Sequence, residues 1–177
     1  MTDNEYIESL LKEPEGPQTA FFEDFNYDKI AETVCAFLNS SGGRIIIGVN
    51  YSHEVIFTLP VENQFLELRK QIYSSILPES LVGIREENYN NRYLVLIEVI
   101  EGAKKPYSIK NRSFIRSNTE TKLADNSDMS NLIRSRRKEE YSWENSPMLD
   151  ATMEDLDMEE ISKAIELCNQ IGRTSRF

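Results

Sequence analysis

The sequence has few of the residues that usually build metal and nucleophilic sites: two cysteines and one histidine in 177 residues. Cys35 and Cys168 lack metal-ligand spacing, so we expect buried thiols in a reducing compartment and no metal. His53 has no second histidine and no nearby cysteine, and we expect it in a hairpin turn. Neither Cys35 nor Ser41 has a base at a recognisable spacing, which argues against nucleophilic catalysis. We expect no cofactor.

The chain also lacks a long apolar run. None approaches the roughly 20 residues that cross a bilayer, and the polar, acidic start shows no signal peptide. We therefore expect a cytoplasmic protein without a membrane partner. Its 40% hydrophobic and 28% charged residues are typical of globular proteins. We expect one domain over residues 1–138, then a polar linker and a C-terminal helix over 139–177 that lead to a missing effector domain.

Acidic residues outnumber basic ones by 30 to 20, but the two kinds are unevenly distributed. Residues 1–103 hold 17 acids and 7 bases, residues 104–138 hold 3 acids and 10 bases, and residues 139–177 hold 10 acids and 3 bases. The net charge of −10 argues against a protein that coats nucleic acid indiscriminately. Residues 104–138 are nevertheless a candidate anion surface, because phosphate binding depends on local Lys and Arg. The alternative is a solvated basic face that neutralises acidic neighbours.

A helix, a turn and a strand follow one another over residues 29–49. Apolar residues recur at helical spacing up to Asn39, and the continuous run from Ile45 to Ile47 is typical of a strand covered on both faces. Gly42 and Gly43 favour a turn between them, since glycine enters the left-handed region without a Cβ penalty. Such a turn could bring backbone amides close to a phosphate. It precedes a strand, however, whereas a P-loop precedes a helix, so we favour a purely structural turn.

The remaining pattern predicts short strands and helices. We expect helices over 5–11, 61–77, 127–138 and 161–171, and strands over 19–25, 44–49, 55–57, 81–87, 93–99, 107–109 and 113–116. Asp28 is the expected cap of the helix over 29–39, and Asn90 and Asn91 suit a two-residue hairpin turn. The fold class is α/β, of the α+β mixed kind: one domain with a mixed, largely antiparallel sheet flanked by helices.

Three stretches, in order, resemble the Schlafen AlbA-like domain. The first is the helix, glycine turn and strand over 35–49; the second is Lys105-Pro106-Tyr107 followed by the strand over 113–119; the third is the exit segment over 132–136 and beyond. Together they span about residues 5–160. The resemblance implies an N-terminal module of the kind found in bacterial proteins described as transcriptional regulators or divergent ATP-binding proteins.

Some relatives of this kind cleave RNA with two glutamates five residues apart and an aspartate after the central strand. This chain departs from that pattern, because Glu23 is preceded at that spacing by Gln18 and Asn50 stands where the aspartate would follow. One carboxylate seldom suffices to hold a divalent ion. We therefore predict no catalytic residues and no nuclease activity. A degenerate metal-dependent ribonuclease or an ATP-binding protein is kept as an alternative.

The resemblance implies a non-catalytic regulator module that binds nucleic acid, with DNA preferred over RNA, whereas the residues themselves support an anion-binding surface. Tyr107 and Phe114 would add aromatic faces for stacking on bases. Arg116 has an alternative structural role, as an arginine that pairs with an internal carboxylate. The competing hypothesis is a protein-interaction or homo-oligomerisation module. The predicted nucleic-acid-binding residues are Lys104, Lys105, Lys110, Arg112, Arg116, Lys122, Arg134, Arg136, Arg137 and Lys138, beside the motif turn of Asn39, Gly42 and Gly43.

Overall fold

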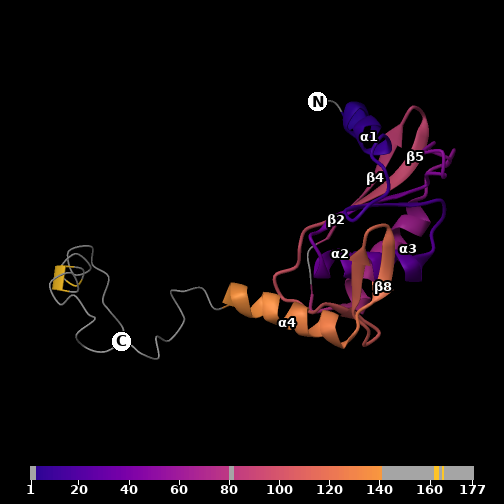
Figure 1. Cartoon of the computed structure of the whole chain (residues 1–177). Helices are drawn as coiled ribbons and strands as arrows, with labels where there is room; N and C mark the ends of the chain where they lie inside the picture. The colour runs from indigo at the N-terminus through magenta and orange to yellow at the C-terminus, as the bar shows by residue number, and fades with distance from the viewer. Residues whose placement is uncertain (1–2, 80–81, 141–161, 164, 166–177) are drawn as a thin grey trace. The chain divides into compact units, whose positions relative to one another are not determined.

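A computed structural model of the chain describes residues 3–79, 82–140, 162–163 and 165; of residues 3 and 137–140 it describes the backbone alone (Figure 1). The chain divides into two units, Met1–Glu140 and Tyr141–Phe177. Residues 162–163 and 165 of the second unit are helical. The predicted linker and the rest of the predicted last helix lie outside the described residues.

The first unit is built on a four-stranded sheet with the strand order β1-β2-β5-β4. Strands β1 (Thr19–Phe22) and β2 (Gly43–Ile47) are parallel, and helix α2 (Tyr27–Asn39) connects them. Strand β5 (Arg92–Val99) is antiparallel to both β2 and β4 (Val82–Tyr89). The predicted mixed, largely antiparallel sheet flanked by helices is therefore confirmed.

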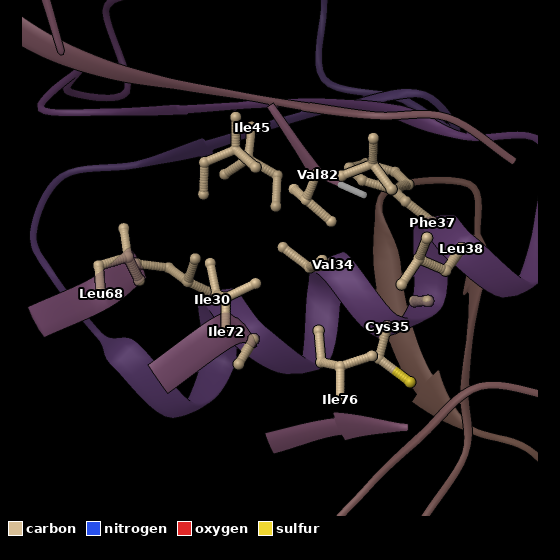
Figure 2. Packing of buried hydrophobic residues seen from close by; sticks show 14 of the residues in the cluster. Ile30, Val34, Cys35, Phe37, Leu38, Ile45, Leu68, Ile72, Ile76 and Val82 are labelled. Carbon is tan, nitrogen blue, oxygen red and sulfur yellow. The ribbon is translucent and has the colours of Figure 1, made fainter. Parts of the chain in front are cut away.

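Both faces of the sheet are covered, as the run of three isoleucines predicts. Ile45 and Ile47 point into the larger core with α2 and α3 (Glu62–Ser75), whereas Ile46 packs on the opposite face against α1 (Asp3–Leu11). Figure 1 shows α1 on one side of the sheet and the other two helices on the opposite side. Figure 2 shows side chains from α2, α3 and β2 meeting in the larger core. Burial on two faces explains why this strand has no polar alternation.

The last part of the first unit contributes to two small two-stranded sheets. Strand β6 (Ser108–Ile109) pairs with β3 (Ile76–Leu77), and β7 (Phe114–Ser117) pairs with β8 (Glu120–Leu123). The strands predicted over 107–109 and 113–116 thus form with slightly different bounds, each with its own partner, and an isolated bridge joins Ile109 to Arg112. Helix α4 (Asn126–Glu140) follows β8.

Other predicted boundaries need small corrections. Asn26, not Asp28, caps α2, because the Asn26 side chain accepts a hydrogen bond from the Lys29 amide. Helix α3 ends at Ser75, and β3 occupies the last two positions of the predicted 61–77 helix. The predicted strand over 55–57 is reduced to isolated bridges. Among the described residues, no helix is both long enough and apolar enough to cross a membrane.

Candidate nucleic-acid interface

The ten predicted basic residues lie on two parts of the fold, the segment from β5 to β8 and helix α4. In α4, Leu132 is buried, while Arg134 and Arg136 are exposed. Arg137 and Lys138 belong to the same helix, but their side chains lie outside the described residues. Because residues three and four apart share a helix face, the positions of Arg134, Arg137 and Lys138 fall on one side of α4.

Two further bases, Lys110 and Arg112, are exposed and form ion pairs with acids of α2. Lys110 lies 2.9 Å from Asp28, and Arg112 lies 3.3 Å from Glu32, so both reach the N-terminal half of α2. The Arg112 guanidinium also lies over the Phe114 ring, 5.4 Å from its centre. Exposed pairs of this kind contribute little to stability, so a phosphate can replace the carboxylate at small cost.

Lys122 links the hairpin of β7 and β8 to helix α4. Its amine lies 3.3 Å from a carboxylate oxygen of Asp128 in the first turn of α4. Arg134 follows six residues later, which is about 9 Å along the helix axis. Lys104 lies on the segment after β5; its side chain is exposed. The accessible bases thus extend from the loop after β5, across the hairpin, to α4.

Two of the predicted bases have structural roles. The Lys105 side chain is 7% exposed, and its amine donates hydrogen bonds to the Ser40 carbonyl and the Glu101 carboxylate. The Arg116 side chain is 4% exposed and donates to the carbonyl oxygens of Gly16 and Thr19, at 3.1–3.2 Å. Both cations hold loops in place and have little surface left for a phosphate.

The electrostatics of Arg116 agree with this structural role. Burial lowers the pKa of its guanidinium, and the Glu15 carboxylate, 3.7 Å away, opposes that shift. The guanidinium also lies over the Phe37 ring, with 5.4 Å from its carbon to the ring centre. This is the structural alternative that the sequence left open, with backbone carbonyls as the main acceptors instead of an internal carboxylate.

A hollow of about 370 Å³ adjoins Arg116, between β1, α2 and the β7–β8 hairpin. Its charged lining is mixed, with Lys29 opposed by acids that include Glu32 and Glu120. The hydroxyls of Thr33 and Thr121 meet across it at 3.1 Å. A wall of both signs offers no favourable surface for a polyanion, so this hollow is not part of the candidate interface.

The glycine turn is in close contact with neighbouring backbone at both of its glycines. Gly42 has a φ of 70°, and a Cβ there would lie 2.6 Å from the Val99 carbonyl oxygen. A Cβ at Gly43 would lie 2.7 Å from the Gln18 carbonyl oxygen. The Gly42 amide donates to Phe37, and the Arg44 amide donates to Gln18. These amides are already hydrogen-bonded within the protein, which agrees with a structural turn and not with a phosphate cradle.

Asn39 at the start of this turn is 4% exposed and connects three elements. Its side-chain amide donates to the carbonyls of Tyr107 and Phe114, both at 2.9 Å, and its oxygen accepts from the Tyr107 amide at 2.7 Å. The Cys35 thiol also donates to the Tyr107 carbonyl at 3.4 Å. Asn39 therefore fixes the chain on either side of Lys110 and Arg112 against α2.

The prediction that Tyr107 and Phe114 offer faces for stacking is wrong. They are only 4% and 5% exposed and belong to the larger core. Sequence reasoning also missed the acids Asp28 and Glu32, which lie about 80 residues from the bases they neutralise. Nothing in the sequence around Lys110 and Arg112 indicated that Asp28 and Glu32 would be their ion-pair partners.

The residues considered for catalysis are dispersed. Glu23 is exposed just after β1, and His53 lies in the predicted turn, where its Nδ1 is 2.7 Å from the Leu11 carbonyl oxygen. Across the described ranges, no three acidic, histidine or cysteine side chains gather as a metal site would require. The absence of catalytic activity stays a prediction.

Comparison with known proteins places the chain in a family. Residues 5–125 match the family model described as Schlafen, AlbA_2. The chain belongs to this family. The Schlafen AlbA_2 match covers more than half of the sequence and includes β1, the glycine turn and the β7–β8 hairpin. No curated protein matches this chain.

Two solved structures are similar to it. The DIP2311 protein from Corynebacterium diphtheriae is 17% identical with a TM-score of 0.58, and the match covers 96% of this chain but 38% of that one. The N-terminal domain of a protein from Nitrosomonas europaea, described as related to the ATP-dependent DNA helicase RecG, is 18% identical with a TM-score of 0.49. That match covers 62% of this chain and 81% of the other. The Corynebacterium protein shares the fold, and this chain spans well under half of its length.

Proposed function

We propose that this Schlafen AlbA_2 chain binds nucleic acid through a basic surface and performs no catalysis of its own. We define the basic surface by its exposed members, Lys104, Lys110, Arg112, Lys122, Arg134 and Arg136. Arg137 and Lys138 join it by their positions on α4. Duplex DNA is the proposed partner and transcription regulation the proposed role, both from the resemblance to regulator modules.

The observation that supports this proposal is the concentration of accessible positive charge in a chain of net charge −10. Residues 104–138 contain ten bases and three acids, and six of those bases are exposed in the described part of the chain. The acids that pair with Lys110, Arg112 and Lys122 are on the same unit. These carboxylates partly neutralise the three bases, so a single small anion is attracted only weakly. A nucleic acid presents several adjacent phosphates, which can displace several carboxylates at once.

Fluorescence anisotropy tests the proposal with labelled duplex DNA, single-stranded DNA and RNA at low and moderate salt. We expect affinity to fall linearly with the logarithm of salt, with duplex DNA bound most tightly. The variant Arg134→Ala/Arg137→Ala, at two positions on the same side of α4, should bind more weakly and should reduce the salt slope by about 2, near one per phosphate contact removed. A matched control is Lys12→Ala/Arg69→Ala, which removes the same charge from exposed positions outside the basic surface.

Each outcome is informative. Equal losses in the two double variants would show that net charge, not this surface, governs binding, and would contradict the proposal. No binding to any probe at low salt would also contradict it. Tighter binding of RNA or single strands would retain the surface but refute the preference for duplex DNA.

The absence of catalysis is tested separately, with RNA and DNA substrates and either Mg²⁺ or Mn²⁺. We expect no cleavage, because Glu23 belongs to no group of three or more acidic, histidine or cysteine side chains in the described structure. Metal-dependent cleavage that disappears in Glu23→Ala would show that the non-catalytic assignment is wrong.

A further inference from the structure

The two edges of the four-stranded sheet differ in how they are closed. Strand β1, at one edge, is four residues long, and its Thr19 carbonyl accepts hydrogen bonds from the Gly16 amide and the Arg116 guanidinium. Strand β4, at the other edge, is eight residues long. Among the described residues, no strand pairs with the outer side of β4. A long open strand edge is a template for pairing with another chain.

The backbone groups on the open side of β4 belong to every second residue. Asn88 lies opposite Tyr93 of β5, and the Tyr93 amide donates away from β4, to the Phe57 carbonyl at 2.9 Å. Asn88 and Tyr93 are therefore a non-hydrogen-bonded pair, so the Asn88 amide and carbonyl face outward. The same alternation turns the amides and carbonyls of Ile84 and Glu86 outward. We call these outward groups of Ile84, Glu86 and Asn88 the β4 edge; their alternating donors and acceptors fit an extended chain.

The side chains of β4 are complementary to those of a second copy. Gly83, Arg85 and Glu87 follow one another on one face of the strand, and Gly83 and Arg85 are exposed. In an antiparallel pair centred on Glu86, Arg85 of each copy faces the partner's Glu87. Opposite charges directly across two strands stabilise their pairing. Moving the centre by one residue, to Arg85 or to Glu87, would instead place like charges opposite each other.

We propose that the β4 edge docks a second copy of this chain, in antiparallel pairing about a two-fold axis at Glu86. The outward groups of Ile84 then bond with those of the partner's Asn88, and Glu86 bonds with the partner's Glu86. In a two-fold interface each contact occurs twice, so the register brings two attractive ion pairs. The pairing joins the two sheets into one. Strand β4 contains no residue of the basic surface, so the dimer does not depend on the proposed nucleic-acid binding.

Other contacts of β4 limit the strength of this pairing. The Glu86 carboxylate accepts a hydrogen bond from the Val61 amide at 2.8 Å, which holds it toward α3 of its own chain although two such carboxylates flank the axis. The Tyr73 hydroxyl donates to the Val82 carbonyl, which closes the edge before Ile84. One pair of short strands buries less than the roughly 1,200 Å² of the smallest standard interfaces, so we expect a weak, concentration-dependent dimer.

Sedimentation velocity of the full chain at increasing concentrations, up to about 500 µM, tests the proposal. We expect a monomer–dimer equilibrium. Asn88→Pro should raise the dimer dissociation constant about tenfold, because it removes the amide that each copy donates to the partner's Ile84. That amide faces away from β5, so the proline leaves the β4–β5 ladder intact. Asn88→Ala is the matched control, since it keeps the amide and should dimerise as the wild type does.

Far-UV circular dichroism checks that these variants remain folded. A wild-type monomer at every concentration overturns the proposal. A dimer that Asn88→Pro leaves unchanged overturns the assignment of the interface to the β4 edge, as does an equal loss of dimer in Asn88→Ala.

Disulfide cross-linking tests the register without relying on proline. In a Cys168→Ser background, Glu86→Cys should form a covalent dimer with diamide, because hydrogen-bonded partners in antiparallel strands have Cα atoms about 5.5 Å apart, within the range of a disulfide. Asn88→Cys is the matched control: in this register its partner cysteine lies four residues, or roughly 14 Å, further along the strand. Absence of the Glu86→Cys cross-link, or equal cross-linking at position 88, overturns the register centred on Glu86.

Discussion

Replacing Asn39 by alanine tests whether this buried side chain holds the basic segment against the core. Its three hydrogen bonds, at 2.7–2.9 Å, reach Tyr107 and Phe114 across 68 and 75 residues of sequence. Asn39→Ala removes all three and leaves the Tyr107 amide without this acceptor. The carbonyl of Tyr107 would keep the weak thiol donor of Cys35, and the carbonyl of Phe114 would lose its side-chain donor.

The size of the effect follows from the number of bonds. A buried hydrogen bond contributes about 1 kcal/mol net, so the loss should be about 3 kcal/mol. Alanine's higher helix propensity returns at most about 0.7 kcal/mol, and less at the last position of a helix. Since small domains are stable by about 5–15 kcal/mol, the variant should fold but unfold at clearly lower denaturant concentration.

Urea unfolding followed by far-UV circular dichroism measures this change in the full chain. Asn131→Ala is the matched control, because Asn131 is exposed on α4 and should change the free energy of unfolding by less than about 0.5 kcal/mol. A loss below about 1 kcal/mol for Asn39→Ala would refute the reasoning. It would mean that the segment carrying Lys110 and Arg112 is held by its apolar contacts alone.

Three further predictions concern stability and reactivity. Gly42→Ala should cost more than about 2 kcal/mol in thermal unfolding, because its φ is 70° and the Cβ would clash with the Val99 carbonyl; Gly83→Ala, whose Cβ would meet the Glu98 carbonyl oxygen at 3.7 Å, should be nearly neutral. Burial would raise the pKa of Glu98, but hydrogen bonds from Tyr6 and Arg85 hold it below its usual range. A carboxylate whose pKa is lower in the folded state stabilises the fold at pH values above its unfolded pKa of about 4.3, and this stabilisation is lost as the pH falls. In urea unfolding, Glu98→Gln should therefore destabilise the protein at pH 7 but have little effect below about pH 4. An equal effect at both pH values would contradict this. Burial also raises the pKa of the Cys35 thiol to about 11, so a Cys168→Ser variant should resist alkylation at pH 8 until it is unfolded, and rapid labelling of the native protein would show that Cys35 is accessible.

The sequence predicted the parts of this fold that depend on local patterns. Ile45–Ile47 indicated a strand covered on both faces, and the two cores confirm it. Asn90 and Asn91 indicated a two-residue turn, and both adopt positive φ, at 51° and 59°. Such features depend on the conformational preferences of a few adjacent residues, so a single sequence is sufficient to find them.

Strand partners far apart in the sequence could not be predicted in the same way. Strand β6 pairs with β3, about 30 residues earlier, and not with the strand predicted over 113–116, which follows it closely in the sequence. Strand β8 was missed because its Glu120–Leu123 sequence is polar and short, with little β signal. The turn at Asn118, with a φ of 52°, joins β7 to β8 and was the one local sign of this hairpin.

The sequence also could not show which of the predicted basic residues are accessible on the surface. The sequence located the basic segment, but only the fold separates Lys105 and Arg116, which are buried, from the bases that remain accessible. Removing these two leaves at most eight of the ten predicted bases to contact phosphates. With a slope of about −0.9 per phosphate on duplex DNA, the dependence of log affinity on log salt should not be steeper than about −7. A steeper slope would require phosphate contacts from bases outside residues 104–138, and the acidic remainder of the chain makes such contacts unfavourable.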